Sequence, residues 1–313
     1  MKKAISGLGF LLLSTEILFN VIYLIFSVFT EVSNIFSSLF YMENYSAITE
    51  FLHGTIIFLS FFLIGLLYCV FSGTKLSSVI TFKKVKPKKI TAYVFFGLSI
   101  AYLGNVVATL LSNNLSLLGI PGTSNNSETD YNTLSFIVMT FVTSVTPAFA
   151  EEFLFRGIIL GKLRKYGDSF AVLASAFLFA LMHANIPQIP FAFVGGIFFG
   201  FITVKTNSLL PAMITHFANN FISCAEQIIY SYGNEYIINF VSVLLFAIIL
   251  ILGIISFIYL IKTDDKLFRF DKSKNYYDSF SLKEKIKWFS TNPGIICAVV
   301  FLLLETFLYA SRG

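Results

Sequence analysis

The stretch TPAFAEEFLFRGIIL, residues 146–160, places two adjacent glutamates and an arginine in a run that is otherwise almost wholly apolar. Two further apolar stretches carry one histidine each: FLFALMHA contains His183, and PAMITHFANNF contains His216 and Asn220. An ionisable side chain at membrane depth is costly and by default indicates function. These residues therefore predict a catalytic cluster inside a membrane.

The composition is that of a membrane protein. The chain is 56% hydrophobic and 12% charged, whereas an ordinary soluble domain has about 25% charged residues. Several windows exceed the roughly 18 apolar residues that are needed to cross a bilayer. We expect an all-α, polytopic bundle of about nine transmembrane helices, at residues 7–29, 51–72, 91–112, 134–163, 169–186, 188–204, 208–230, 238–261 and 292–310.

The positive charge predicts the orientation of these spans, because cytoplasmic loops carry an excess of Lys and Arg. Twenty of the 22 basic residues fall on one side if nine spans alternate, and Arg156 and Arg312 are the exceptions. The loops 30–50, 113–133 and 231–237 contain no Lys or Arg. We therefore expect a multi-pass cell-membrane protein with its N-terminus in the cytoplasm and its C-terminus outside. The net charge of +5 indicates no nucleic-acid partner, because the lysines cluster beside membrane spans.

The same pattern predicts three parts. Residues 1–133 hold three spans and an external loop at 113–133, residues 134–230 hold the polar cluster, and residues 231–313 hold the last spans. A basic cytoplasmic segment occupies 262–290, and its mixture of charged and aromatic residues favours an interfacial helix. The three cysteines show neither paired nor metal-type spacing, so no disulfide framework is expected.

Helical spacing predicts which of the polar residues pair with each other. Glu152 and Arg156 are four residues apart, so they face each other on one helix and can form a buried ion pair. Glu151 is rotated by about 100° from Glu152 and stays free for another task. Pro147 removes a helical hydrogen bond and is expected to kink the span near the site.

The other two motifs have the same spacing. Phe179 and His183 share a helix face, as do His216 and Asn220. From the basic ends of their spans, Glu151 lies roughly 18 Å deep, His183 roughly 21 Å and His216 roughly 12 Å, so their depths overlap. Three glycines, Gly195, Gly196 and Gly200, form a small-residue stripe that predicts close helix packing.

These residues resemble the CPBP family of intramembrane proteases, which includes type II CAAX prenyl endopeptidases and bacterial proteins linked to bacteriocin self-immunity. The family pattern is EExxxR, then FxxxH, then HxxxN or HxxxD. It is matched here by Glu151-Glu152-x-x-x-Arg156, Phe179-x-x-x-His183 and His216-x-x-x-Asn220. The resemblance covers roughly residues 134–230 and implies a four-helix catalytic core.

The resemblance also implies roles. Glu151 and His183 would activate a water, and His216 and Asn220 would stabilise the oxyanion. Glu152 and Arg156 would hold the site in shape, while Phe179 would shape the cavity wall. Alternatively, Glu151, His183 and His216 could bind zinc as two histidines and a carboxylate. The family has been described in both ways, so the cofactor is either none or zinc.

The leading hypothesis is an intramembrane endopeptidase that cleaves a peptide or membrane-protein substrate near the cytoplasmic half of the lipid bilayer. A second is an inert immunity or scaffold protein of the same fold, and a third is a proton-coupled transporter. The complete set of motif residues favours the first. A transporter would more often show paired repeats with broken helices, and none is evident. A prenylated substrate is not predicted.

Overall fold

The computed structural model describes residues 2–37, 45–117, 133–270 and 280–312. Within these ranges every regular element is a helix, apart from an isolated antiparallel bridge between Phe82 and Ser208. The chain is an all-α bundle, as the sequence predicted.

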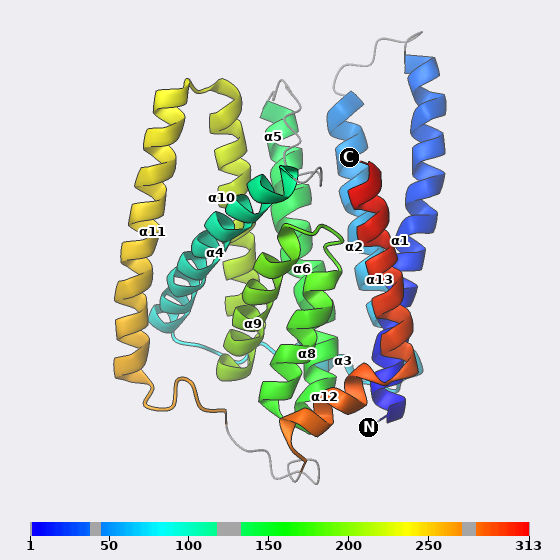
Figure 1. Ribbon diagram of the computed structural model, residues 1–313, viewed down its shortest axis with the longest axis vertical. Helices are drawn as coiled ribbons and strands as arrows, with labels where there is room; N and C mark the ends of the chain where they lie inside the picture. The colour runs from blue at the N-terminus through cyan, green and yellow to red at the C-terminus, as the bar shows by residue number, and fades with distance from the viewer. Residues whose placement is uncertain (1, 38–44, 118–132, 271–279, 313) are drawn as a thin grey trace.

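The centre of the bundle holds the three motifs. It begins with a long composite helix made of α5 (Thr133–Thr140), η1 (Phe141–Val145), α6 (Thr146–Glu151), η2 (Glu152–Leu160) and α7 (Gly161–Leu163). A short 3-10 turn, η3 (Arg164–Tyr166), leads into α8 (Asp168–Leu181), which is followed by α9 (Gln188–Thr206) and α10 (Leu210–Tyr232). These helices pack against one another in the middle of Figure 1.

Two groups of helices flank this centre. On one side, α1 (Lys2–Ser37) packs against α2 (Tyr45–Phe71) and α13 (Pro293–Arg312). On the other side, α4 (Pro87–Ser116) packs against α11 (Glu235–Thr263) and also against α9 and α10. Two short helices remain: α3 (Leu76–Val79) and α12 (Leu282–Ser290).

The outer faces are apolar, as expected for helices in lipid. Val243, Ile251 and Ile255 of α11 and Phe307 of α13 each expose more than half of their surface. In contrast, all nine residues of η2 are buried. A lipid-facing surface and a closed centre are what a polytopic membrane protein requires.

Seven helices among the described residues are long and apolar enough to cross a membrane. They correspond to the predicted spans except 169–186 and 208–230. The first of these two is α8, which has only 14 residues, and the second is α10, which has 23 residues but carries Asn219, Asn220 and Glu226. Whether α8 and α10 also cross the bilayer therefore stays a prediction.

The helix predicted at 169–186 was too long. α8 ends at Leu181, and His183 lies in the turn that follows. Ala184 adopts a left-handed conformation with φ of 48°, which breaks the helix. Pro187 then precedes the start of α9. His183 is thus held on a bend between two buried helices.

The composite helix departs from α geometry on both sides of the glutamates. η1 and η2 are both π-helical, and Pro147 lies two residues after the end of η1. π-helical turns often occur at functional sites because they rotate side chains out of the regular register. The change from π-helical to α-helical geometry therefore occurs beside Pro147, where a kink was predicted.

The glycine stripe of α9 is confirmed at two of its three positions. A Cβ on Gly196 would lie 3.0 Å from Ala176 Cα, and one on Gly200 would lie 3.1 Å from Leu160 Cδ1. At Gly195 only Phe199, in the same helix, lies within reach, at 4.0 Å. Gly196 and Gly200 let α9 approach its neighbours, whereas Gly195 does not serve this purpose.

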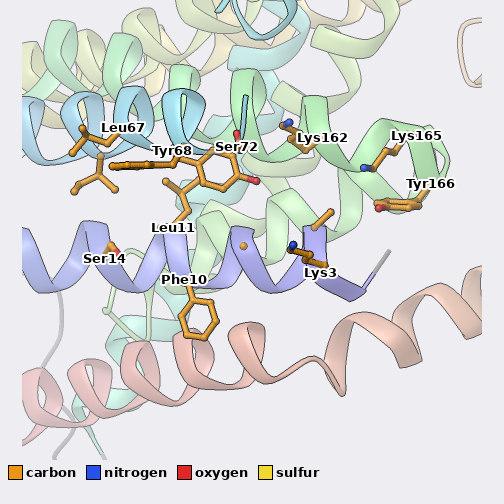
Figure 2. Close-up of a pocket in the computed structure, with 14 residues that line it drawn as sticks. Lys3, Phe10, Leu11, Ser14, Leu67, Tyr68, Ser72, Lys162, Lys165 and Tyr166 are labelled. Carbon is orange, nitrogen blue, oxygen red and sulfur yellow. The ribbon is translucent and has the colours of Figure 1, made fainter. Parts of the chain in front are cut away.

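One end of the bundle, here called the basic end, carries the N-terminus of α1, the start of α4 and the last residues of α7, α9 and α11 (Figure 1). Lys89 and Asp264 form an ion pair of 3.2 Å there. A cavity of about 840 Å³ also opens at this end, lined by Lys3, Lys162 and Lys165 together with apolar side chains (Figure 2). None of the residues of the predicted catalytic cluster lines it.

The orientation can be tested with reporters. A reporter that is active only outside the cytoplasm should be active when inserted within 113–133 and inactive when inserted within 263–290. We expect this result because the lysines are concentrated at the basic end, and cytoplasmic loops carry an excess of Lys and Arg. Protease accessibility of tags at the same two positions is the independent check, and a reversed pattern would contradict the predicted orientation.

Candidate active site

The ion pair predicted between Glu152 and Arg156 is present. Arg156 Nη1 lies 3.0 Å from Glu152 Oε1, and both side chains are 0% exposed. Arg156 Nη2 also donates to the carbonyl of Gly196 at 3.4 Å. The guanidinium lies 4.2 Å from the centre of the Phe179 ring and 5.1 Å from that of Phe199. The charge of Arg156 is therefore held by a carboxylate and by two aromatic faces.

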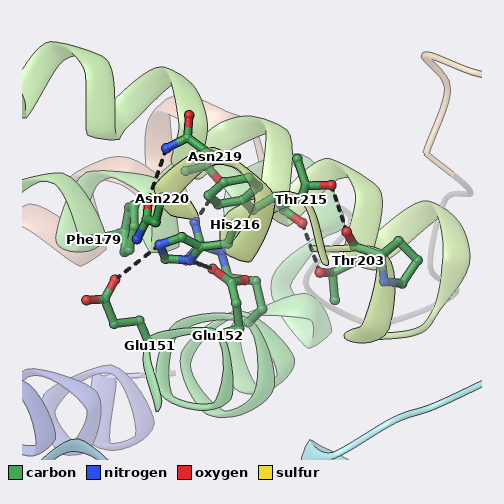
Figure 3. A network of polar contacts seen from close by, with 12 residues as sticks. Glu151, Glu152, Phe179, Thr203, Thr215, His216, Asn219 and Asn220 are labelled. Carbon is green, nitrogen blue, oxygen red and sulfur yellow. Dashed lines mark hydrogen bonds and ion pairs between the residues drawn. The ribbon is translucent and has the colours of Figure 1, made fainter. Parts of the chain in front are cut away.

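Glu152 has a second partner, which its spacing with Arg156 did not predict. His216 Nδ1 lies 2.9 Å from Glu152 Oε1, the same oxygen that pairs with Arg156 (Figure 3). Since the carboxylate pairs with Arg156, the Nδ1 atom of His216 is the donor. The ring of His216 also stacks on Phe199, with 5.1 Å between centroids and 17° between planes. Glu152 thus fixes the orientation of His216 as well as the charge of Arg156.

The other nitrogen of His216 faces Glu151. Nε2 lies 3.9 Å from Glu151 Oε2, a separation that is longer than a hydrogen bond (Figure 3). Glu151 keeps 18% of its side chain exposed, whereas Glu152 is fully covered. The two adjacent glutamates therefore have different surroundings, and only Glu151 reaches open space.

His183 is oriented by the last turn of α8. Its Nδ1 atom lies 2.9 Å from the carbonyl oxygen of Phe179, and its ring meets the Phe179 ring edge to face at 4.8 Å. A carbonyl oxygen can only accept, so Nδ1 carries a proton. In the neutral imidazole Nε2 is then a free acceptor, which is the form a general base needs.

Asn220 contacts the composite helix beside Pro147. In an α-helix the carbonyl of Thr143 would pair with the N–H of residue 147, but proline has none. Asn220 Nδ2 donates to this carbonyl at 2.9 Å. The amide of Asn220 has a second N–H, and no partner for it is found within the described residues. Asn220 of α10 therefore donates to a carbonyl of the composite helix with which Pro147 cannot pair.

One cavity of about 230 Å³ brings these groups together. Its lining includes the four residues predicted to be catalytic, which are Glu151, His183, His216 and Asn220. Phe179 also lines it, as expected for a residue of the wall. Glu152 and Arg156 lie behind the wall and are fully buried. Residues from three separate stretches of the sequence thus surround a space that can hold a scissile bond and a water.

Comparison with protein families matches this region. Residues 133–222 match the family model described as Rce1-like: type II CAAX prenyl endopeptidase Rce1-like. These residues are similar to that family and are here called the Rce1-like domain. The match is consistent with a CPBP family protein and with a membrane-embedded protease family. No match was found among curated proteins or solved structures.

The Rce1-like domain does not arrange the alternative zinc ligands as a metal site. Zinc with two histidines and a carboxylate needs all three ligands within about 2.0–2.2 Å of one ion. Among the described residues, no three His, Cys, Asp or Glu side chains are placed so that they could hold a metal ion. His216 still offers Nε2 to the cavity, because only its Nδ1 atom is bound to Glu152.

The catalytic cavity is also lined by a residue that sequence reasoning did not predict. Asn219 is 8% exposed and lines the same cavity. Its Nδ2 atom donates to Asn220 Oδ1 at 3.0 Å (Figure 3). The sequence feature that could have indicated Asn219 is the pair of adjacent asparagines in an apolar helix. Only the second of them, Asn220, fits the HxxxN spacing.

Proposed function

We propose that this protein is an intramembrane endopeptidase that hydrolyses peptide bonds of membrane-associated substrates with a water activated by Glu151 and His183. The observation that supports the proposal is the single cavity lined by Glu151, His183, His216 and Asn220. The Rce1-like match over residues 133–222 supports the same reaction class.

The first step is attack by water. Glu151 is the exposed carboxylate of the pair, and His183 offers Nε2 as a second acceptor for the protons of a water between them. Glu151 takes one proton as the oxygen of the water bonds to the peptide carbonyl carbon. A positioned base of this kind contributes about 10²- to 10⁴-fold to the rate. The product of this step is a tetrahedral intermediate with a negatively charged oxygen.

The second step is collapse of that intermediate. The second N–H of Asn220 and the Nε2–H of His216 donate to the oxyanion, as preorganised donors do in a dry site. His216 can donate from Nε2 only as an imidazolium, since Glu152 already holds the proton on Nδ1. The carboxylates of Glu151 and Glu152 lie at its two nitrogens, 3.9 and 2.9 Å away. The C–N bond then breaks as the leaving nitrogen receives the proton from Glu151.

The assay for this proposal is cleavage of a membrane-inserted peptide library by purified protein in lipid nanodiscs. We expect the wild-type protein to release defined fragments, detected by mass spectrometry, and the Glu151→Gln variant to release none. Absence of cleavage by folded wild-type protein would contradict the proposal and favour the inert immunity or scaffold protein.

Removal of metal is a separate test of the mechanism. We expect stringent depletion with a chelator to leave the rate of cleavage unchanged, because the described residues form no three-ligand site and water activation needs only Glu151 and His183. The measurement pairs the rate with the metal content of the same preparation. Activity that falls with depletion and returns in proportion to bound zinc would contradict this mechanism.

A further inference from the structure

A second cavity, of about 580 Å³, adjoins the catalytic one and is here called the vestibule. The two share Gln188, Phe191, Asn219 and Asn220 in their linings. The vestibule is formed by α4, α10, η1, the turn between α8 and α9, and the start of α9. It is therefore the adjoining space from which a chain segment can reach the candidate catalytic residues.

The vestibule lies on the far side of the catalytic residues from the basic end. Along α10, which starts at Leu210, His216 lies about 9 Å from that end and Glu226 about 24 Å. Along α4, which starts at Pro87, Asn105 of the vestibule lies about 27 Å from the same end. A substrate segment that uses the vestibule approaches the cavity from the end opposite the lysines.

The amide of Asn219, which borders this space, holds a buried acceptor. The carbonyl of Thr143 can only accept, so Asn220 must turn its Nδ2 toward it and its Oδ1 away. Asn219 must then turn its own Nδ2 toward Asn220 Oδ1. This leaves Asn219 Oδ1 as a buried acceptor, and it has no hydrogen-bond partner in the described part of the chain.

Other acceptors line the vestibule further along. Asn185 is 9% exposed, and its Oδ1 atom is likewise buried without a partner among the described residues. Glu226 accepts a hydrogen bond from the hydroxyl of Tyr102 at 2.5 Å through Oε1, while its Oε2 has no hydrogen-bond partner among the described residues. No Lys or Arg is among the described residues that line the vestibule. Its wall thus combines a carboxylate with unpaired amide oxygens.

Such a wall favours a ligand that is rich in donors. A buried acceptor left unpaired costs free energy, which a donor from the ligand recovers. Lys and Arg side chains carry only donors and a positive charge. A backbone N–H of an extended peptide is the matching donor for an amide oxygen.

We propose that the vestibule binds an extended segment of the substrate and that Glu226 selects a Lys or Arg in it. In this arrangement Asn219 Oδ1 accepts a backbone N–H close to the scissile bond. This inference rests on the proposed protease function and adds the class of substrate to it. Glu226 is six residues beyond Asn220, or about 9 Å along α10. With a rise of about 3.3 Å per residue in an extended peptide, the basic residue lies about two to four residues from the scissile bond.

The experiment uses a panel of membrane-inserted peptides that share one sequence. A single position, moved through the four residues on each side of the cleavage site, carries Lys, Gln or Glu. We expect wild-type protein in nanodiscs to cleave the best Lys peptide with a kcat/KM about 10- to 100-fold above that of its Gln counterpart, the range for a hydrogen bond to a charged group. The Glu peptide should be the poorest of the three.

Variants of vestibule residues then test whether Glu226 is the residue that selects the basic side chain of the substrate. In Glu226→Gln the ratio of kcat/KM for the Lys and Gln peptides should fall to near one, and in Glu226→Lys the Glu peptide should become the best. Tyr102→Phe is the matched control, since it removes the hydrogen bond to Glu226 but keeps the charge, and the preference for Lys should persist. Each ratio is independent of how much active protein a preparation contains.

Binding separates failure of this inference from failure of the protease. The Lys and Gln peptides are titrated with fluorescence anisotropy against Glu151→Gln protein, and a tighter Kd for the Lys peptide supports the vestibule even if no cleavage occurs. Cleavage of all peptides without preference, or a preference that survives Glu226→Gln, overturns the inference and leaves the protease proposal standing.

Discussion

The Glu151→Gln variant is expected to lose at least about 10²-fold in the rate of peptide cleavage, because it removes the general base. Gln keeps the size of the side chain, and among the described residues Glu151 makes no hydrogen bond that the change would break, since His216 Nε2 lies 3.9 Å away. Expression and thermal stability should therefore stay close to those of the wild-type protein. The measurement is single-turnover cleavage of a membrane-inserted peptide in nanodiscs.

The matched control is Glu305→Gln, which makes the same chemical change at another glutamate in an apolar helix. Glu305 lies in α13, is partly buried, and lines neither the catalytic cavity nor the vestibule. We expect this variant to cleave at the wild-type rate. Wild-type turnover by Glu151→Gln would remove Glu151 from the mechanism, whereas equal losses in both variants would indicate a general effect of charge in the membrane.

Local geometry explains which parts of the site the sequence could predict. Residues four apart on a helix lie on one face whatever surrounds them. The Glu152–Arg156 ion pair and the Phe179–His183 contact both follow from this rule, and both are present. The positions of the long apolar helices follow from bilayer thickness for the same reason, because a window of suitable length is a local property. Their ends do not, since α1 and α4 extend beyond the predicted 7–29 and 91–112 on both sides.

Contacts between helices could not be predicted in this way. The bond from His216 to Glu152 joins residues 64 positions apart and depends on the rotation of α10 against η2. That rotation follows from the side chains on both helices and from the π-helical turns on either side of α6. From the sequence, Arg156 was therefore the one partner predicted for Glu152.

Asn219 and the end of α8 were missed for similar reasons. Asn219 belongs to no i, i+4 motif, and its importance appears only where two cavities meet at α10. α8 ends at Leu181 because Ala184 is left-handed, and alanine gives no sequence signal for such a conformation. The nearest helix-breaking residue in the sequence is Pro187, which lies beyond the turn.

The Glu152→Ala variant is expected to lose both stability and activity. It strands Arg156, which is 1% exposed, without its carboxylate. Removal of one partner from a buried ion pair typically costs about 3–5 kcal/mol. It also removes the acceptor that orients Nδ1 of His216. The protein should therefore show a lower Tm in detergent and little cleavage.

A double variant separates these two effects. Glu152→Met together with Arg156→Met removes both charges, and replacement of a buried ion pair by apolar residues of similar size is often neutral or stabilising. We expect its Tm to return toward the wild-type value. Activity should stay lost, because His216 still lacks the carboxylate that holds it against Phe199. Recovery of both Tm and cleavage would show that Glu152 serves Arg156 alone. An unchanged Tm in Glu152→Ala with lost cleavage would show instead that Glu152 acts mainly through His216 in the reaction.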